Sequence, residues 1–366
     1  MTRSPSLPAG ERLRAWSELL RVSALLSVPG DALAGAAAVG ARPGRGTAWA
    51  LGSSLCLYEA GMALNDWADR HEDAAERPHR PVPSGRVSPG AALGAAGVLT
   101  AAGLALAARA GRPPLAVATA LAATVWAYDL RLKHTAAGPA AMATARGLDL
   151  LLGATATVSA TGRGTGGSSR PTRRTADGTG GASRRTVAPP LAASPLAALP
   201  SAAVLAAHTY AVTAVSRHEV QGGSTVAPLG ALAAATVLGA LTASRRPDPY
   251  HQGPHHHGPH HPDPAHPAPY RPGAGRRPPG ASRRSTVRRV TPLLAAVYVR
   301  TAARPLLHAA LNPSPLLTGR AVGGGIRAMI PLQAALMSRS GATAGGLALL
   351  GLVPLTRRLA RKVSPT

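Results

Sequence analysis

Apolar runs of about twenty residues, rich in alanine, glycine, leucine and valine, recur along the chain from Val22 to Leu355. One such run can be a buried core helix. A series of them indicates transmembrane helices, because a helix needs about 20 apolar residues to cross the hydrocarbon of a bilayer. The sequence therefore predicts an all-α, polytopic membrane helix bundle with about nine transmembrane helices, and a tenth span stays open.

The sequence supports the expected spans of the first two thirds of the chain better than the last three. The seven spans before residue 244 are better supported, whereas arginines and a histidine break the runs after residue 290, so one of the last three can be re-entrant or interfacial. The expected spans lie near 21–42, 47–65, 89–110, 113–130, 138–160, 193–216, 224–243, 291–312, 320–338 and 342–357.

Two polar segments interrupt this pattern. Residues 162–190 are mainly Gly, Thr, Ser and Arg, and residues 244–290 are mainly Pro, His, Gly and Arg. Neither segment has enough apolar surface to offset the entropy cost of ordering, so both are predicted to be disordered insertions. The histidines of the second insertion indicate a biased tract rather than a metal site, because no ligand spacing repeats. The predicted organisation is an N-terminal cytoplasmic segment (1–20), bundle segments at 21–161 and 191–243, and C-terminal transmembrane helices within 291–366.

The chain is strongly basic, with a formal net charge of +25. Most of the excess lies in low-complexity segments and at helix ends, and aromatic residues make up only 3% of the chain, so we expect no nucleic-acid partner. The first apolar run follows Arg3, Arg12 and Arg14 and lacks a small-residue cleavage site, which predicts a first span rather than a removed signal peptide. The single Cys56 excludes an intrachain disulfide.

The acidic residues are concentrated in one place. The segment 59–76 holds six of the fifteen acidic side chains and directly follows an apolar run. On a helix that continues through this segment, Asp66, Asp69 and Asp73 fall within an arc of about 60°, and Asn65 widens the arc to about 100°. Clustered oxygen ligands suit Mg²⁺, which completes its coordination with water and substrate phosphate. The sequence therefore predicts a Mg²⁺ site at a membrane boundary.

The alternative for this segment is a solvated helix end. In that case the carboxylates form salt bridges with Arg70, Arg77 and Arg80, which follow within the next turns and the adjoining loop. The position at the end of an apolar span favours the functional interpretation, because polar groups at membrane depth are costly and usually functional.

Two further polar clusters follow later spans. Tyr128, Arg131 and Lys133 come after the fourth span and can bind a diphosphate, although they also fit a basic stop with an interfacial tyrosine. Arg217 and Glu219 come after the sixth span and can supply a phosphate contact and a second metal ligand, or simply end a helix before a glycine turn. All three clusters follow even-numbered spans, so they are predicted to meet on one membrane face.

Two opposite charges fall inside the fifth predicted span. Arg146 and Asp149 are three residues apart and can pair along one helix face. If Arg146 faces the bundle interior, it can help to hold an anionic substrate, because intramembrane charges usually face inward.

The motif Asn65-Asp66-x-x-Asp69-x-x-x-Asp73, followed by Arg-Pro-x-Arg-Pro-x-Pro-Ser-Gly, resembles the first aspartate-rich motif of the UbiA family of intramembrane prenyltransferases. The segment from Tyr128 to Lys133 is similar to the tyrosine–lysine motif of that family. The span order fits from about residue 15 to 243. Where the family has a second aspartate-rich motif, this chain has only Glu219 as an acid, which resembles the EboC-like branch.

The resemblance implies transfer of a polyprenyl group from its diphosphate to a lipophilic, in some members aromatic, acceptor. It implies Mg²⁺ as the cofactor and catalytic roles for Asp66, Asp69, Asp73 and Lys133. The implied metal ligands are Asn65, Asp66, Asp69, Asp73 and Glu219. The implied diphosphate-binding residues are Arg77, Arg80, Tyr128, Arg131, Lys133, Arg146 and Arg217.

The resemblance also implies an integral protein of the cell membrane with its active-site loops in the cytoplasm. With the active-site loops in the cytoplasm, both Arg-rich insertions lie outside, so charge counting alone favours the opposite orientation. Two other functions stay open: another membrane enzyme that acts on a lipid-linked phosphate, and a non-enzymatic transporter or scaffold with a cation site. The sequence does not determine the oligomeric state.

Overall fold

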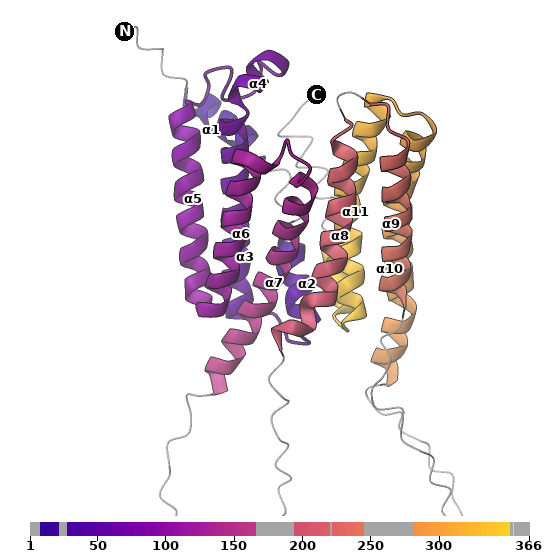
Figure 1. Ribbon diagram of the computed structural model, residues 1–366. Helices are drawn as coiled ribbons and strands as arrows, with labels where there is room; N and C mark the ends of the chain where they lie inside the picture. Colours follow the sequence, from indigo (N-terminus) through magenta and orange to yellow (C-terminus); the bar gives the residue numbers. More distant parts are fainter. Residues whose placement is uncertain are drawn as a thin grey trace, which may run out of the picture.

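The computed structural model describes residues 8–21, 28–165, 194–219, 222–244, 281–351 and 354. Within these ranges the chain forms helices and short connections and no strand, so the all-α prediction is confirmed (Figure 1). The helices are α1 (Ala9–Leu19), α2 (Pro29–Ala38), α3 (Arg45–Ala68), α4 (Arg70–Glu76), α5 (Pro89–Ala110), α6 (Arg112–Ala127), the π-helix η2 (Tyr128–Leu132), α7 (Gly138–Thr165), the 3₁₀ helix η3 (Pro195–Ala198), α8 (Leu199–Ser216), α9 (Val226–Ala243), α10 (Ala281–Leu311), α11 (Pro315–Arg339) and α12 (Thr343–Gly351).

Local sequence explains where several helices begin and end. Ser88 precedes α5 and accepts a hydrogen bond from the Ala91 N–H at 3.2 Å, and a proline follows it at the first helical position. Ser314 has the same role before α11 and accepts from the Leu317 N–H at 3.4 Å. Gly111 separates α5 from α6 with a φ of 134°, a conformation that few other residues adopt.

Four of the described helical segments are long and apolar enough to cross a membrane: Pro89–Ala110, Arg112–Leu132, Pro195–Ser216 and Val226–Ala243. The helices α3, α7, α10 and α11 are longer, with 24, 28, 31 and 25 residues, but carry more polar side chains. The protein is an integral membrane protein, and the number of about nine spans stays a prediction.

The bundle has two groups of helices joined by α2 and α7 (Figure 1). The helices α3, α5 and α6 pack together on one side, and α8 to α11 pack together on the other. Small residues let α2 and α7 approach closely, because a Cβ on Gly153 would lie 2.4 Å from the Ala32 Cα and one on Gly35 would lie 2.1 Å from the Leu150 carbonyl oxygen.

The polar clusters predicted to meet do lie at one end of the bundle. The C-terminal ends of α3, η2 and α8 are at the end that also carries α1 and α4 (Figure 1). A hydrogen bond from Arg217, after α8, to the Thr135 carbonyl oxygen, after η2, joins two of these connections directly. We call this end of the molecule the motif end.

Some predicted boundaries differ from the structure. The helix α7 continues to Thr165 and α10 begins at Ala281, so the edges of both polar insertions are helical. Residues 166–193 and 245–280, which include most of the predicted insertions, lie outside the described ranges. The first predicted span, 21–42, contains α2, and residues 22–27 are likewise not described.

Candidate functional site

The acidic segment is a broken helix rather than the continuous one supposed from sequence. The helix α3 ends at Ala68, Asp69 has φ −85° and ψ 3°, and the short helix α4 begins at Arg70. Asp66 and Asp73 nevertheless lie close to the same guanidinium, that of Arg80 in the following loop. The break therefore keeps these two carboxylates together and turns Asp69 toward a different neighbour.

Asp66 and Asp73 are almost completely buried, with exposed fractions of 4% and 1%. Arg80 Nη1 lies 2.8 Å from Asp73 and 3.5 Å from Asp66. Arg77 lies 3.5 Å from Asp73, and Arg21, at the end of α1, lies 3.8 Å from Asp66. Arginine charge thus balances the buried acids, as buried carboxylates require.

The second cluster lies directly against the first. Lys133 forms an ion pair with Asp69, and the Asn65 side chain donates to Asp129 Oδ1 at 3.3 Å. Asp129 is 5% exposed and was not among the predicted site residues, although it stands within the segment from Tyr128 to Lys133. Arg131 is exposed. The structure therefore brings the aspartate-rich segment and the tyrosine–lysine segment together across 64 residues of sequence.

A cavity of about 280 Å³ lies between α3, α6, η2 and α7. Asn65, Tyr128 and Asp129 line it toward the motif end, and Ser54, Arg146 and Asp149 line it farther along α3 and α7. Apolar side chains such as Leu57, Leu121 and Val125 make up much of the rest. The residues that line it are Arg21, Ser54, Leu57, Tyr58, Gly61, Met62, Asn65, Leu121, Val125, Tyr128, Asp129, Met142, Ala145, Arg146 and Asp149. Polar groups toward the motif end with apolar side chains beside them suit a molecule with a charged head and a hydrocarbon tail.

Arg146 and Asp149 do not form the pair along α7 that sequence spacing suggests. Arg146 lies 2.5 Å from Asp31 of α2, and Asp149 accepts a hydrogen bond from Ser54 of α3 at 2.5 Å. Asp31 is fully buried and also accepts from Gln333 of α11 at 2.7 Å. Sequence analysis missed Asp31, although an acid within an apolar run is itself a signal for an interior polar contact.

The third cluster is only partly joined to the other two. Arg217 reaches the Thr135 carbonyl oxygen beside the tyrosine–lysine segment. Glu219 lies against α11, where a Cβ on Gly319 would come 3.0 Å from its Oε1 atom. Among the described residues, no ion pair or hydrogen bond joins Glu219 to the aspartate-rich segment.

Comparison with known proteins agrees with this geometry. The model of the UbiA prenyltransferase family matches residues 26–219, a range that contains all three polar clusters. The chain belongs to the UbiA prenyltransferase family.

Curated UbiA relatives match the chain over part of their length. A digeranylgeranylglyceryl phosphate synthase from Methanopyrus kandleri is 37% identical over 128 residues, which cover 34% of this chain and 45% of the relative. One from Ignicoccus hospitalis is 34% identical over 152 residues, which cover 41% of this chain and 50% of the relative. The matches thus span about half or less of these relatives.

Solved UbiA structures share the fold along most of the chain. A structure of digeranylgeranylglyceryl phosphate synthase has a TM-score of 0.52 at 14% identity, and the match covers 91% of this chain and 99% of the other. A UbiA homologue from Archaeoglobus fulgidus bound to GPP and Mg²⁺ has a TM-score of 0.51 at 16% identity, covering 86% and 99%. At this identity the likeness shows the shared fold, which confirms the UbiA-like bundle.

Proposed function

We propose that this UbiA family member transfers a polyprenyl group from its diphosphate to a lipophilic acceptor at the motif end of the bundle. The observation that carries the proposal is the meeting of the aspartate-rich and tyrosine–lysine segments, where Lys133 pairs with Asp69 and Asn65 donates to Asp129. Asn65, Tyr128 and Asp129 of these segments also line the cavity. The names of the curated relatives and the GPP and Mg²⁺ in the Archaeoglobus fulgidus homologue support the same chemistry.

The acidic residues fit a magnesium ion. The buried oxygens of Asp66 and Asp73 converge on the single Nη1 atom of Arg80, so a dication with hard-oxygen preference can replace that guanidinium. Asn65, Asp66, Asp69 and Asp73 would hold the ion. Glu219 is a proposed ligand for a second ion. When bound, Mg²⁺ neutralises charge on the leaving diphosphate.

The basic residues then exchange partners. Arg77, Arg80 and Lys133 contact carboxylates, and a dication bound to those carboxylates would release them to donate hydrogen bonds to phosphate oxygens. Tyr128 lines the cavity and can donate its hydroxyl to the same group. Arg131 and Arg217 are proposed to add positive charge at the rim, and Arg146 to help position an anionic substrate from inside the bundle.

Bond cleavage follows from this arrangement. The allylic C–O bond breaks, its electron pair leaves with the diphosphate, and the positive charge stays on the prenyl carbon. Donors held around the leaving oxygens lower the barrier because they are already oriented when the charge develops. The apolar wall, which includes Leu57, Leu121 and Val125, excludes water until a nucleophilic atom of the acceptor forms the new bond and loses its proton.

The test is transfer of a radiolabelled prenyl group in membranes supplied with Mg²⁺. Replacement of Asp66→Ala or Asp69→Ala is expected to abolish transfer, while the protein still inserts. Replacement of Glu18→Ala is the control, because Glu18 is a motif-end acid that pairs with Arg86 away from the cavity. Unchanged transfer in both aspartate variants would contradict the proposal, and ion flux without turnover would favour a transporter.

We also propose that the motif end faces the cytoplasm across the cell membrane, as in the family resemblance. The orientation is testable because Cys56 is the only cysteine. In a Cys56→Ser background, Ser84→Cys at the motif end and Pro43→Cys before α3 mark opposite ends of the bundle. A membrane-impermeant maleimide should label the Pro43→Cys variant in intact cells; labelling of the Ser84→Cys variant instead would reverse the orientation. The EboC-like branch stays a prediction.

A further inference from the structure

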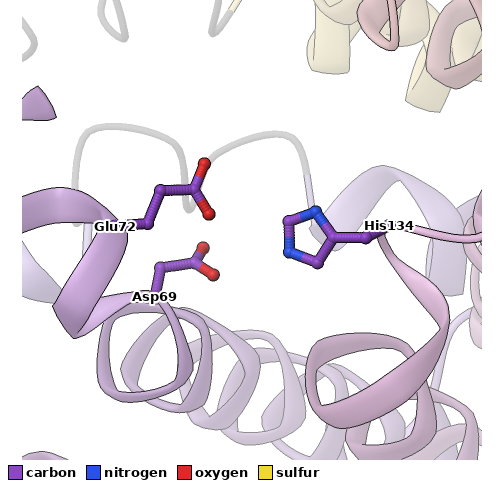
Figure 2. Close-up of side chains that lie close together, drawn as sticks. All are labelled: Asp69, Glu72 and His134. Atoms are coloured by element: carbon purple, nitrogen blue, oxygen red, sulfur yellow. The ribbon is translucent and has the colours of Figure 1, made fainter.

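Three side chains from two separate segments converge at the rim of the proposed diphosphate site. Asp69 at the break between α3 and α4, Glu72 in α4 and His134 after η2 each place a ligand atom within 4.8 Å of the other two. Figure 2 shows the two carboxylates on one side of a common space and the imidazole facing them from the other side. Neither Glu72 nor His134 has a role in the magnesium site described above.

We propose that Asp69, Glu72 and His134 form a binding site for a first-row transition-metal dication, with Mn²⁺ and Zn²⁺ as the fitting ions. The donor set decides the class of ion. Imidazole is a ligand for Zn²⁺, Fe²⁺ and other transition metals, whereas Mg²⁺ takes oxygen ligands almost exclusively. Two carboxylates beside one imidazole supply the negative charge that a dication needs.

The geometry allows an ion after modest side-chain movement. Ligands about 2.1 Å from one ion lie about 3 to 4 Å from each other, so the trio must close by about 1 Å or more. Glu72 and His134 are exposed, so a change of rotamer at these two side chains could bring the ligand atoms closer. The backbone beneath His134 is fixed by hydrogen bonds from the Lys133 N–H to the Tyr128 carbonyl at 3.0 Å and from the Thr135 N–H to the Leu132 carbonyl at 2.9 Å.

The charge around Asp69 also favours a bound cation. The Lys133 ammonium contacts this carboxylate, so the position favours a cation. Glu72 forms no ion pair with any described residue, in contrast to Asp66 and Asp73, which arginines neutralise. A dication at the rim would add Glu72 and His134 to Asp69 and displace the ammonium.

The transition-metal site rests on the proposed function in one respect only, because Asp69 belongs to both this site and the proposed magnesium site. A transition-metal ion at this trio would take Asp69 from Lys133, as Mg²⁺ would, so transfer kinetics do not distinguish the two ions. The metal site itself is tested without any substrate, which keeps its failure separate from failure of prenyl transfer.

The probe is Mn²⁺ followed by electron paramagnetic resonance. The protein is the full chain in detergent micelles, with the seven histidines between positions 251 and 266 replaced by glutamine to remove the imidazoles of that His-rich segment. We expect bound Mn²⁺ with ¹⁴N coupling from one imidazole that excess Mg²⁺ does not remove. In His134→Gln the coupling should disappear and Mn²⁺ affinity should fall by about tenfold or more.

His71→Gln is the matched control, because His71 is an exposed α4 histidine outside the trio, and it should retain both the coupling and the affinity. Mg²⁺-dependent prenyl transfer should persist in His134→Gln and reports that this variant is folded. If it does not fold, Glu72→Gln provides the same affinity test. Absence of nitrogen-coupled Mn²⁺ in the parent, coupling that survives in His134→Gln, or unchanged affinity in Glu72→Gln would overturn the inference.

Discussion

Replacement of Arg80→Ala tests the idea that an arginine holds the place of the magnesium ion. The Arg80 guanidinium lies 2.8 Å from Asp73 and 3.5 Å from Asp66, and both carboxylates are buried. The substitution leaves two buried negative charges facing each other with weaker compensation. The protein should therefore lose stability without Mg²⁺ and should gain more from Mg²⁺ than the unchanged protein does.

The expected magnitude follows from burial and from the remaining partners. Removing one partner of a fully buried ion pair costs about 3 to 5 kcal/mol. The Arg80 side chain is 20% exposed, and Arg77 and Arg21 stay 3.5 Å and 3.8 Å from the two acids. We therefore expect a loss of about 2 kcal/mol in the free energy of unfolding. Mg²⁺ at about ten times its dissociation constant should restore about 1.4 kcal/mol.

The assay is unfolding in mixed detergent micelles, with and without Mg²⁺ and inorganic diphosphate. Arg86→Ala is the matched control, because Arg86 pairs at 2.7 Å with Glu18, whose side chain is 38% exposed, and should cost about 1 kcal/mol or less. In the unchanged protein, Mg²⁺ should stabilise strongly only when diphosphate is present to accept the released arginines. If Arg80→Ala is no more destabilising than Arg86→Ala, and its response to Mg²⁺ is unchanged, the partner-exchange argument is wrong.

Three further predictions concern packing, the buried ion pair and the diphosphate. Gly153→Val should destabilise the protein by about 1 to 3 kcal/mol in the same unfolding assay, because its Cβ would meet Ala32. Arg146→Met should cost about 3 kcal/mol, because it leaves the fully buried Asp31 without its cation, and a double replacement with Asp31→Asn should recover part of that loss. Lys133→Met should raise the KM for prenyl diphosphate in a transfer assay. Lys133→Arg should raise the KM less, because arginine keeps the positive charge but presents a different donor geometry from lysine. An unchanged KM in Lys133→Met would show that Lys133 does not bind the diphosphate.

Helix periodicity and apolar length predicted the architecture well. The predicted span 89–110 coincides with α5, and the predicted spans from 113 to 243 match α6 to α9 within a few residues at each end. The prediction was weaker where local signals conflict. No proline or glycine lies at the helix break at Asp69, so the sequence predicted a continuous helix through the acidic segment.

The sequence alone determined that this protein is a helical membrane bundle with its acidic side chains gathered at one boundary, because apolar length and local charge are properties of the chain itself. Only the tertiary structure decided which basic side chain forms an ion pair with which carboxylate. Arg146 pairs with Asp31 across 115 positions, and Asp69 meets Lys133 across 64. Such pairings depend on how the helices pack and rotate, and a buried charge takes the partner that packing brings to it rather than the nearest one along the chain.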